Sequence, residues 1–321
     1  MTLAPAAART VAVVVAYNRR DLLIEVLDAL AAQTVPVDAV VVVDNASTDD
    51  TAALVRERYG YADLVSVSRN TGGAGGFAIG AARALVRQNA DLVWLMDDDT
   101  VPTETALEAL LTSVGDDPQV TIAGSRVVWT DGQDHPMNTP RVKPFVGARE
   151  RAAATAREAL PVRSSSFVSM LVRADAVRRH GLPIADYFIW NDDFEFSTRI
   201  LRRSRGLFVP ASVVVHKTVK LGATDIDPGE RFYYEVRNKV WLLRLARGLS
   251  PAEKVLYAGS TVRRWARTFR ASANRPVLVS GLRRGLRDGF RSRPRPNTVA
   301  LAGLGEASDD VAACEAGVAR A

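Results

Sequence analysis

The chain has 321 residues, 47% of them hydrophobic, so it can bury a sizeable core in one large domain with an appendage or in two domains. Its single cysteine excludes an internal disulfide, no apolar stretch reaches the roughly 18 residues of a membrane-spanning helix, and no basic segment precedes the first apolar run as in a secretory signal. From these absences we expect a cytoplasmic protein. The net charge of +6 comes from one basic C-terminal segment.

The first hundred residues alternate between strand and helix patterns. Continuous apolar runs rich in β-branched residues, typical of parallel strands buried on both faces, occur at 10–16, 38–43, 64–68 and 92–96. Helical patterns follow the first three runs and end near residues 33, 58 and 88. These repeated units predict an α/β fold with a mostly parallel central sheet and helices on both faces.

Polar residues follow these strands at the points where they end. They are Asn18, Asp44-Asn45, Asn70 and Asp97 to Asp99. Ligands of open parallel sheets bind beyond the carboxyl ends of the strands. The sequence therefore predicts a ligand site along this edge.

Beyond Thr100 the alternation weakens. Strands are expected at 120–129, at 165–173 and up to residue 216, with helices at 104–114, 174–180, 230–246 and 252–271. We divide the chain into a catalytic α/β domain at 1–230 and a basic, amphipathic helical region at 231–296. The small-residue, mildly acidic tail at 297–321 shows no clear packing face, so we expect it to be disordered.

Asp97-Asp98-Asp99 is the first motif that indicates chemistry. Adjacent carboxylates repel one another unless a cation neutralises them, and the alternate residues Asp97 and Asp99 can face one ion. Carboxylate oxygens suit Mg²⁺ or Mn²⁺, and such an ion would hold a diphosphate. The simpler alternative is a polar loop that caps the next helix. The position after a buried strand favours the metal site.

The glycine-rich segment at 70–77 has two interpretations. Residues 73–78 satisfy the dinucleotide fingerprint G-x-G-x-x-G/A, with acidic residues about 20 positions later, which would indicate an NAD-dependent dehydrogenase. That fingerprint normally follows the first strand, whereas two strand–helix units precede this one. A ribose site also needs one acid, not three in a row. The dehydrogenase is therefore the weaker hypothesis.

Two further candidates lie later in the chain. Asp192 and Asp193 follow the aromatic run 187–190; partial desolvation beside aromatic rings raises the proton affinity of a carboxylate toward that of a general base. Their alternative role is to cap the helix that follows. His216, one of three histidines, ends an apolar strand and suits a third metal ligand, although a lone histidine is more often structural.

The basic region has three interpretations. Residues 231–295 hold 17 Lys and Arg against three acidic residues, which fits a solvated surface, a nucleic-acid patch or a face for anionic lipid. Interleaved Trp, Leu and Phe residues favour helices on an anionic membrane surface. No recognised nucleic-acid motif accompanies the charge, so we expect no nucleic-acid partner.

Six segments in order resemble family 2 glycosyltransferases of the GT-A fold. They are VVVAYNR (13–19), VVVDNASTDDT (41–51), RNTGGAGGF (69–77), WLMDDDTVP (94–102), FIWNDDFEF (188–196) and VVVHKT (213–218). Within that family, the GGAGGF variant combined with three aspartates and a later histidine is similar to bacterial galactofuranosyltransferases. Those enzymes use UDP-galactofuranose to build cell-envelope galactan on a polyprenyl-linked acceptor.

The resemblance implies roles for individual residues. It places Arg19, Asn45, Asn70 and Asp97 near the nucleotide-sugar and its phosphates. Asp97, Asp99 and His216 would bind Mn²⁺ or Mg²⁺. Asp193 would be the base, with Asp192 as its rival.

The implied activity is an inverting sugar transfer at the inner face of the cell membrane. Three alternatives stay open: dTDP-rhamnose as the donor, the dehydrogenase, and a non-catalytic membrane-associated scaffold.

Overall fold

One sheet organises the chain. A computed structural model describes residues 8–136, 138, 141–143, 145–218 and 227–318. Within them ten strands form the sheet, in the order β3-β2-β1-β4-β9-β6-β10-β8-β7 with β5 beside β10. The strands are β1 (Thr10–Ala16), β2 (Ala39–Asp44), β3 (Asp63–Ser66), β4 (Leu92–Asp97), β5 (Thr100–Pro102), β6 (Val120–Val128), β7 (Arg141–Val142), β8 (Leu160–Ser164), β9 (Met170–Arg173) and β10 (Arg205–His216).

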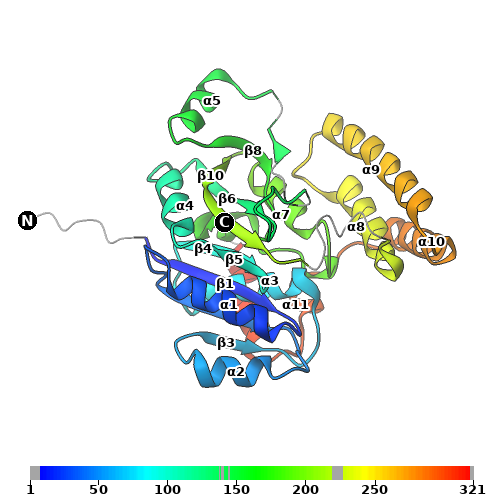
Figure 1. The fold of residues 1–321 in the computed structure, drawn as a ribbon. Helices are drawn as coiled ribbons and strands as arrows, with labels where there is room; N and C mark the ends of the chain where they lie inside the picture. The colour runs from blue at the N-terminus through cyan, green and yellow to red at the C-terminus, as the bar shows by residue number, and fades with distance from the viewer. Residues whose placement is uncertain (1–7, 137, 139–140, 144, 219–226, 319–321) are drawn as a thin grey trace, which may run out of the picture.

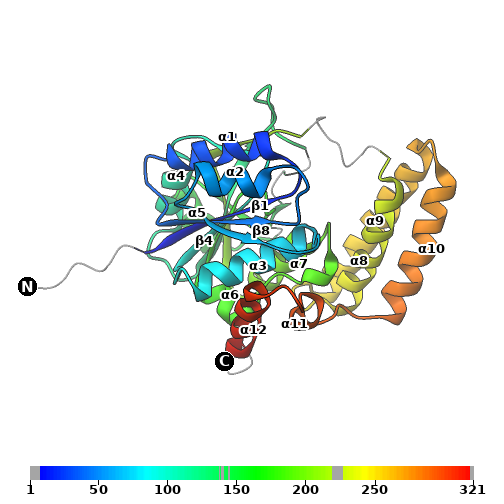
Figure 2. The same ribbon diagram turned by 90° about the horizontal axis from the view of Figure 1, so that it is seen from below.

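Helices cover both faces of this sheet, as Figures 1 and 2 show. They are α1 (Arg20–Ala31), α2 (Thr51–Arg58), α3 (Gly72–Val86), α4 (Ala106–Val114), α5 (Ala148–Thr155), α6 (Ala174–His180), η1 (Ala185–Tyr187), α7 (Asp192–Ile200), η3 (Gly229–Arg231), α8 (Phe232–Leu245), α9 (Pro251–Ala271), α10 (Arg275–Arg291), α11 (Asn297–Ala300) and α12 (Glu306–Val318). The predicted α/β architecture is confirmed.

The strand β1 shows why the sequence forms this sheet. All of its residues are buried, and alternate side chains enter two separate cores: Val11, Val13 and Val15 pack in one, and Ala12 and Val14 in the other. Because successive side chains of a strand point to opposite faces, a strand that is covered on both faces must be apolar throughout. β1 pairs in parallel with β2 and β4.

The sheet becomes mixed in its second half. β9 runs antiparallel to both β4 and β6, and β8 and β5 run antiparallel to β10. The other strands run in one direction, in agreement with the prediction of a mostly parallel sheet. The predicted strand at 165–173 is shorter than expected. Only Met170–Arg173 is a strand, and residues 165–169, here named the serine loop, line a cavity.

The helices α8, α9 and α10 project from one side of the sheet domain (Figure 1). α8 and α10 pack closely because α10 presents glycines at every fourth residue. A Cβ atom at Gly285 or Gly289 would lie 2.7 Å from Val236 or Val240 of α8. Helices approach closely where small residues line the contact. Among the described residues, no helix has both the length and the apolar character that crossing a membrane requires.

The expectation of a disordered tail at 297–321 is wrong for the part that the structure describes. α11 and α12 fold back onto α3 (Figure 2). Leu301, Leu304, Ala307 and Val311 are buried against the sheet domain. Leu301 and Leu304 lie between α11 and α12, and α12 itself contributes only Ala307 and Val311 to this apolar contact. The sequence of the tail therefore shows no broad apolar face. Residues 319–321 lie outside the described residues.

An ion-pair cluster fixes the same contact. Asp310 is 2% exposed and accepts hydrogen bonds from Arg83 at 3.2 Å and Arg87 at 2.7 Å. Arg83 also contacts Asp63 at 2.8 Å and Glu306 at 3.0 Å. The acidic character of the tail, which suggested disorder, therefore matches cations on α3. The tail belongs with the sheet domain and not with the basic helices.

Candidate functional site

The carboxyl ends of the parallel strands meet at one edge of the sheet, as predicted. The register pairs Ala16 with Asp44 and Val15 with Asp97. Arg19 lies just beyond the end of β1 and contacts Asp99. Polar groups from the loops after β1, β2 and β4 are thus adjacent.

The three aspartates occupy different surroundings. Asp97 is partly exposed and lines a cavity. Asp98 is buried and accepts a hydrogen bond from the Tyr17 backbone N–H at 2.8 Å. Asp99 is 2% exposed and pairs with the Arg19 guanidinium. Asp97 and Asp99 can therefore face one cation, whereas Asp98 holds the loop that contains Tyr17.

His216 reaches the aspartates through strand pairing. β5 runs antiparallel to β10 and pairs Thr100 with His216, which brings the imidazole beside the residue before Thr100. The Nε2 atom of His216 lies 3.2 Å from Oδ1 of Asp99. Ligand atoms of Asp97, Asp99 and His216 all lie within 4.8 Å of one another. The structure therefore brings together the three residues that the sequence analysis named as metal ligands.

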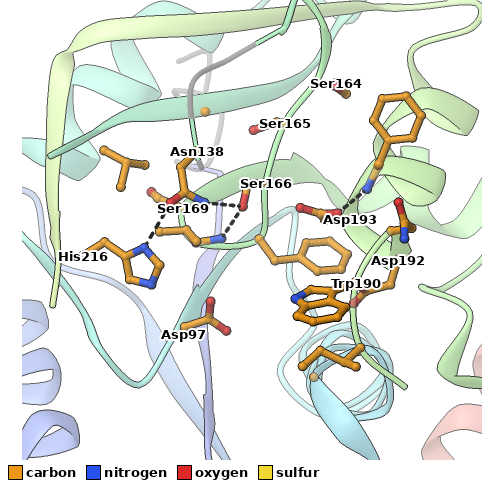
Figure 3. Close-up of a pocket in the computed structure, with 18 of the residues that line it drawn as sticks. Asp97, Asn138, Ser164, Ser165, Ser166, Ser169, Trp190, Asp192, Asp193 and His216 are labelled. Atoms are coloured by element: carbon orange, nitrogen blue, oxygen red, sulfur yellow. Dashed lines mark hydrogen bonds between the residues drawn. The ribbon is translucent and has the colours of Figure 1, made fainter. Parts of the chain in front are cut away.

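Asn138 orients the imidazole from its other side. Its Oδ1 atom lies 3.0 Å from Nδ1 of His216, and its Nδ2 donates to the Ser166 hydroxyl at 3.1 Å (Figure 3). When Nδ1–H donates to the amide oxygen, Nε2 carries the lone pair with which an imidazole can bind a metal. Sequence analysis missed Asn138, because no strand or motif precedes it.

The electrostatics of the cluster suit a cation. Burial, together with the charge of Asp99, raises the pKa of Asp97 to about 6. Burial also raises the pKa of Asp98 to about 8, against the opposing charge of Arg19. Burial acts against ionisation of Asp99, but its hydrogen bond to His216 and the nearby Arg19 hold its pKa below the usual range. Two carboxylates and an imidazole in one buried cluster form a donor set that fits Mn²⁺ or Mg²⁺.

The structure gives Asn45 internal partners. Asn45 is 2% exposed, donates to the Gly72 carbonyl at 2.9 Å and accepts from the Thr71 backbone N–H at 2.8 Å. Asn70 accepts from the Gly72 N–H at 2.7 Å and from Asn45 at 3.2 Å. Both side chains hold the turn before α3. Their predicted contact with a nucleotide stays a prediction, with Asn70 the more accessible of the two.

Two glycines of the 70–77 segment, Gly72 and Gly76, allow close backbone packing. Gly72 has a positive φ of 72°, and a Cβ there would lie 2.0 Å from the Phe188 carbonyl oxygen. Gly76 lies against Val15, where a Cβ would come within 2.4 Å. Glycine is needed wherever the backbone adopts such a φ or approaches another chain segment closely. Of the two glycines that match the dinucleotide fingerprint, Gly75 would place a Cβ 2.5 Å from the Thr71 side chain, whereas a Cβ at Gly73 would meet nothing within 4 Å.

A strained loop precedes the two later carboxylates. Phe188, Trp190 and Asn191 have positive φ values of 64°, 66° and 68°, a conformation that costs about 1–2 kcal/mol for a residue with a side chain. The fully buried Asn238 of α8 holds them in place: its Nδ2 lies 2.9, 2.9 and 3.0 Å from the carbonyls of Tyr187, Ile189 and Trp190.

Asp192 and Asp193 begin α7 after this loop. Asp192 is 7% exposed, and burial together with the charge of Asp193 raises its pKa well above the usual range. Asp193 is half-buried, and its Oδ1 accepts from the Phe194 N–H at 2.6 Å. Figure 3 shows the Asp193 carboxylate extending into the cavity between Trp190 and the serine loop. The helix begins here as predicted, but its N-cap residue is Asn191 and no side chain makes a capping hydrogen bond; the expected aromatic surroundings are present.

One cavity of about 460 Å³ connects Asp97 and His216 with Asn138, Asp192 and Asp193. Asp97 and His216 line its sheet side, and the serine loop, Trp190 and Asp193 line it further along. Its helical wall comes from α8 and α9. Sequence analysis did not identify this wall, since its residues gather only when two amphipathic helices turn the same face inward. They include Phe232, Glu235, Lys239, Arg264, Trp265 and Thr268.

Comparison with known families decides the classification. The model of glycosyl transferase family 2 matches residues 11–179, which include the strands β1 to β4 and the three aspartates. The chain belongs to this family. Family 2 membership agrees with the resemblance stated from the sequence.

Curated relatives are galactofuranosyltransferases named GlfT1. The chain is 32% identical to that of Mycolicibacterium smegmatis over 60% of its own length and 65% of the relative. It is 31% identical to that of Mycobacterium tuberculosis over 72% of its length and 81% of the relative. The chain thus aligns with somewhat less than two thirds of the first relative.

Solved glycosyltransferase structures share the fold. The Staphylococcus aureus TarS structure superposes with a TM-score of 0.61 at 16% identity, covering 97% of this chain and 53% of that one. The mannosyltransferase PcManGT of Pyrobaculum calidifontis, solved with GDP-Man and Mn²⁺, gives 0.54 at 20% identity, with coverage of 97% and 87%. At such identities the likeness shows the fold alone, and this family 2 enzyme has the expected GT-A fold.

Proposed function

We propose that this family 2 glycosyltransferase transfers galactofuranose from UDP-galactofuranose, with inversion, onto a lipid-linked or polysaccharide acceptor in cell-envelope glycan synthesis. The observation that carries the proposal is that Asp97 and His216 of the Asp97–Asp99–His216 cluster line the same cavity as Asp193. The names of the curated relatives support the donor sugar.

The geometry suits a single displacement. The diphosphate of the donor would lie at the Asp97–Asp99–His216 cluster, near the Arg19 guanidinium, which is 43% exposed and can turn toward it. A divalent cation held by that cluster would offset the negative charge that develops on the leaving diphosphate. Arg19 would add a second positive charge at the same oxygens.

Asp193 suits the base in this scheme. It would take the proton of an acceptor hydroxyl as the hydroxyl oxygen bonds to the anomeric carbon and the bond from that carbon to the diphosphate breaks, releasing UDP. The charge of Asp193 contributes to raising the pKa of Asp97, so base and metal cluster are within electrostatic reach. Asp192 is the weaker candidate, because burial favours its protonated form.

A donor panel tests the proposed function. Purified enzyme with Mn²⁺ and a polyprenyl-diphosphate oligosaccharide acceptor should transfer from UDP-galactofuranose, and NMR of the product should show an inverted anomeric configuration. EDTA should stop turnover and Mn²⁺ or Mg²⁺ should restore it. Transfer from dTDP-rhamnose instead would reject the donor assignment, and turnover that is indifferent to EDTA would reject the metal role.

We also propose that the enzyme works at an anionic membrane surface through its basic helices. α9 turns Val255, Leu256 and Val262 outward, at 73%, 72% and 63% exposure, beside the exposed Arg263 and Arg267. Exposed apolar side chains flanked by arginines suit the boundary between headgroups and acyl chains. Sedimentation with liposomes containing phosphatidylglycerol should show binding that weakens from 50 to 300 mM salt. Equal binding to neutral liposomes would contradict this proposal.

A further inference from the structure

The segment at residues 295–302 contacts two loops near the cavity that lie far apart in the sequence. One of them is the turn before α3. There the Arg69 guanidinium donates to the carbonyls of Ala300 and Ala302 at 3.0 and 3.1 Å. Asn70, which is predicted to contact the nucleotide, directly follows Arg69. The 295–302 segment is thereby joined to the donor side of the site.

The second contact is with the residues that lead through η1 into the strained loop before α7. Asn297 is 5% exposed. Its Oδ1 accepts from the Ala185 N–H at 2.9 Å, and its Nδ2 donates to the Pro183 carbonyl at 2.9 Å. Arg295 pairs with Asp186 at 2.6 Å. Because one buried amide bonds two backbone groups with both of its ends, its orientation fixes where the strained loop begins.

The strained loop depends on its surroundings for its conformation. Positive φ values at Phe188, Trp190 and Asn191 are unfavourable for residues with a side chain, so they persist only where other contacts impose them. Asn238 of α8 holds carbonyls within the loop, and Asn297 holds backbone groups just before it. Two buried asparagines, one from α8 and one from the C-terminal tail, thus support adjoining parts of one chain segment.

The strained loop in turn lies between the donor side and the proposed base. Its Phe188 carbonyl accepts from the Ala74 N–H of α3 at 3.1 Å. Trp190 lines the cavity, and Asp193 follows as the second residue of α7. A shift at the start of this loop would move both residues relative to α3. A displacement of about 1 Å can lower the rate of a reaction by about 10²-fold.

We propose that Asn297 is a positioning residue for sugar transfer: through the strained loop, it sets Asp193 at the correct distance from the donor. The inference rests on the proposed function, in which Asp193 is the base. Asn297 does not line the cavity, so it acts through the loop and not on a substrate. A residue that only anchored the tail would contribute to stability and leave turnover of the folded enzyme unchanged.

Asn297→Leu tests this role, because leucine keeps the branched shape and makes neither hydrogen bond. We expect kcat to fall about tenfold or more, while UDP affinity with Mn²⁺, measured by calorimetry, stays within about twofold because the metal cluster lies on other elements. If Asn297→Leu does not fold, Asn297→Asp serves instead. It keeps the acceptor for the Ala185 N–H, loses the donor to the Pro183 carbonyl, and should still lower kcat about threefold or more.

Two control variants separate positioning from stability. Val311 is fully buried in the contact between α12 and α3, so Val311→Ala should lower Tm but leave kcat within about twofold at a temperature at which the chain is folded. Thr298 is exposed and adjacent to Asn297 in sequence, and Thr298→Ala should match the parent chain in both. An equal loss of kcat in Val311→Ala would overturn the positioning role.

Amide hydrogen exchange of the full-length chain tests the hold on the loop without any sugar donor. In Asn297→Leu, exchange should become about tenfold faster or more in peptides that cover residues 183–191, and it should rise at Ala74, whose partner is the Phe188 carbonyl. Val311→Ala should leave exchange in residues 183–191 unchanged. Unchanged exchange there in Asn297→Leu would overturn the inference even if kcat fell, because the loop would not have moved.

The two measurements keep this inference apart from the proposed function. A parent chain that transfers sugar, together with parent-like kcat in Asn297→Leu, would retain the function and overturn the role of Asn297. Faster loop exchange in Asn297→Leu, when the parent chain transfers sugar from no donor, would support the hold on the loop and reject the proposed function.

Discussion

Asp192 and Asp193 are neighbours with different surroundings, and this difference gives the first prediction. Asp193→Asn should lower kcat about 10²- to 10⁴-fold, the usual contribution of a general base, while UDP affinity stays within about twofold. Steady-state transfer assays and UDP calorimetry measure the two quantities. A variant that keeps more than a tenth of the parent kcat would show that another group takes the proton.

Asp192 should reduce stability at neutral pH. Its folded-state pKa lies above its unfolded value, so its ionisation favours the unfolded chain once the pH exceeds about 3.9, the ordinary pKa of Asp. Asp192→Asn should therefore raise Tm by at least ~2 °C at pH 7.5, where ~1 kcal/mol shifts Tm by about 2–4 °C. The gain should shrink toward zero near pH 4. A gain that is constant over this pH range would contradict the assignment to ionisation.

The residues in and around the Asp97–Asp99–His216 cluster could be predicted from the sequence to different degrees. Asp97, Asp99 and His216 all end or follow strands of apolar residues, and parallel strands end at a shared edge, so their meeting follows from pattern and resemblance. Asn138 lies in a connection without periodicity. Asn45 was predicted to contact the nucleotide, but its hydrogen bonds are made within the turn before α3, which only three-dimensional packing reveals.

Among the secondary-structure elements, the loop before α7 and the helix α8 depend on each other. Asn238→Ala would leave three carbonyl acceptors without the amide that now holds them. Losing buried hydrogen bonds costs about 1–3 kcal/mol, and the loop should relax from its positive φ values. We expect kcat to fall at least tenfold with UDP affinity retained, because the donor cluster lies on other elements.

Transfer assays and UDP calorimetry check this expectation. The exposed Asn274 of the same helical region offers Asn274→Ala as a control, which should leave both values unchanged. Parent-like turnover in Asn238→Ala would mean that α8 does not position the loop.

The elements predicted from sequence are those with strong periodicity. The strands β1, β2 and β4 are continuous apolar runs, and α8 and α9 show the expected amphipathic pattern. α12 escaped prediction because it buries few side chains, Ala307, Val311 and the charged Asp310, and because the cations that neutralise its carboxylates lie over 200 residues earlier. Backbone conformations such as the positive φ of Trp190 have no signature in composition, since any loop sequence without glycine is expected to avoid them.

At the scale of the whole molecule, the C-terminal segment contributes to the stability of the sheet domain. Leu301 is 2% exposed and packs near Gly75 of α3. Leu301→Ala should lower the free energy of unfolding by about 2–5 kcal/mol, as for other buried leucines. Val299→Ala, at a side chain that is 56% exposed, should change it by less than ~0.5 kcal/mol. Equal effects in guanidinium titrations would show that the tail does not pack as described.

Because α12 packs on α3, the order in which the ribosome makes the two helices affects how the sheet domain is covered. Arg83 of α3 and its partner Asp310 of α12 are 227 residues apart in the chain, so α3 leaves the ribosome long before α12 does. The face of α3 on which α12 packs therefore stays uncovered until α12 has been made. A ribosome stalled shortly before residue 306 would present a nascent chain whose strands β1 to β10 are all made but whose outer helical layer is incomplete.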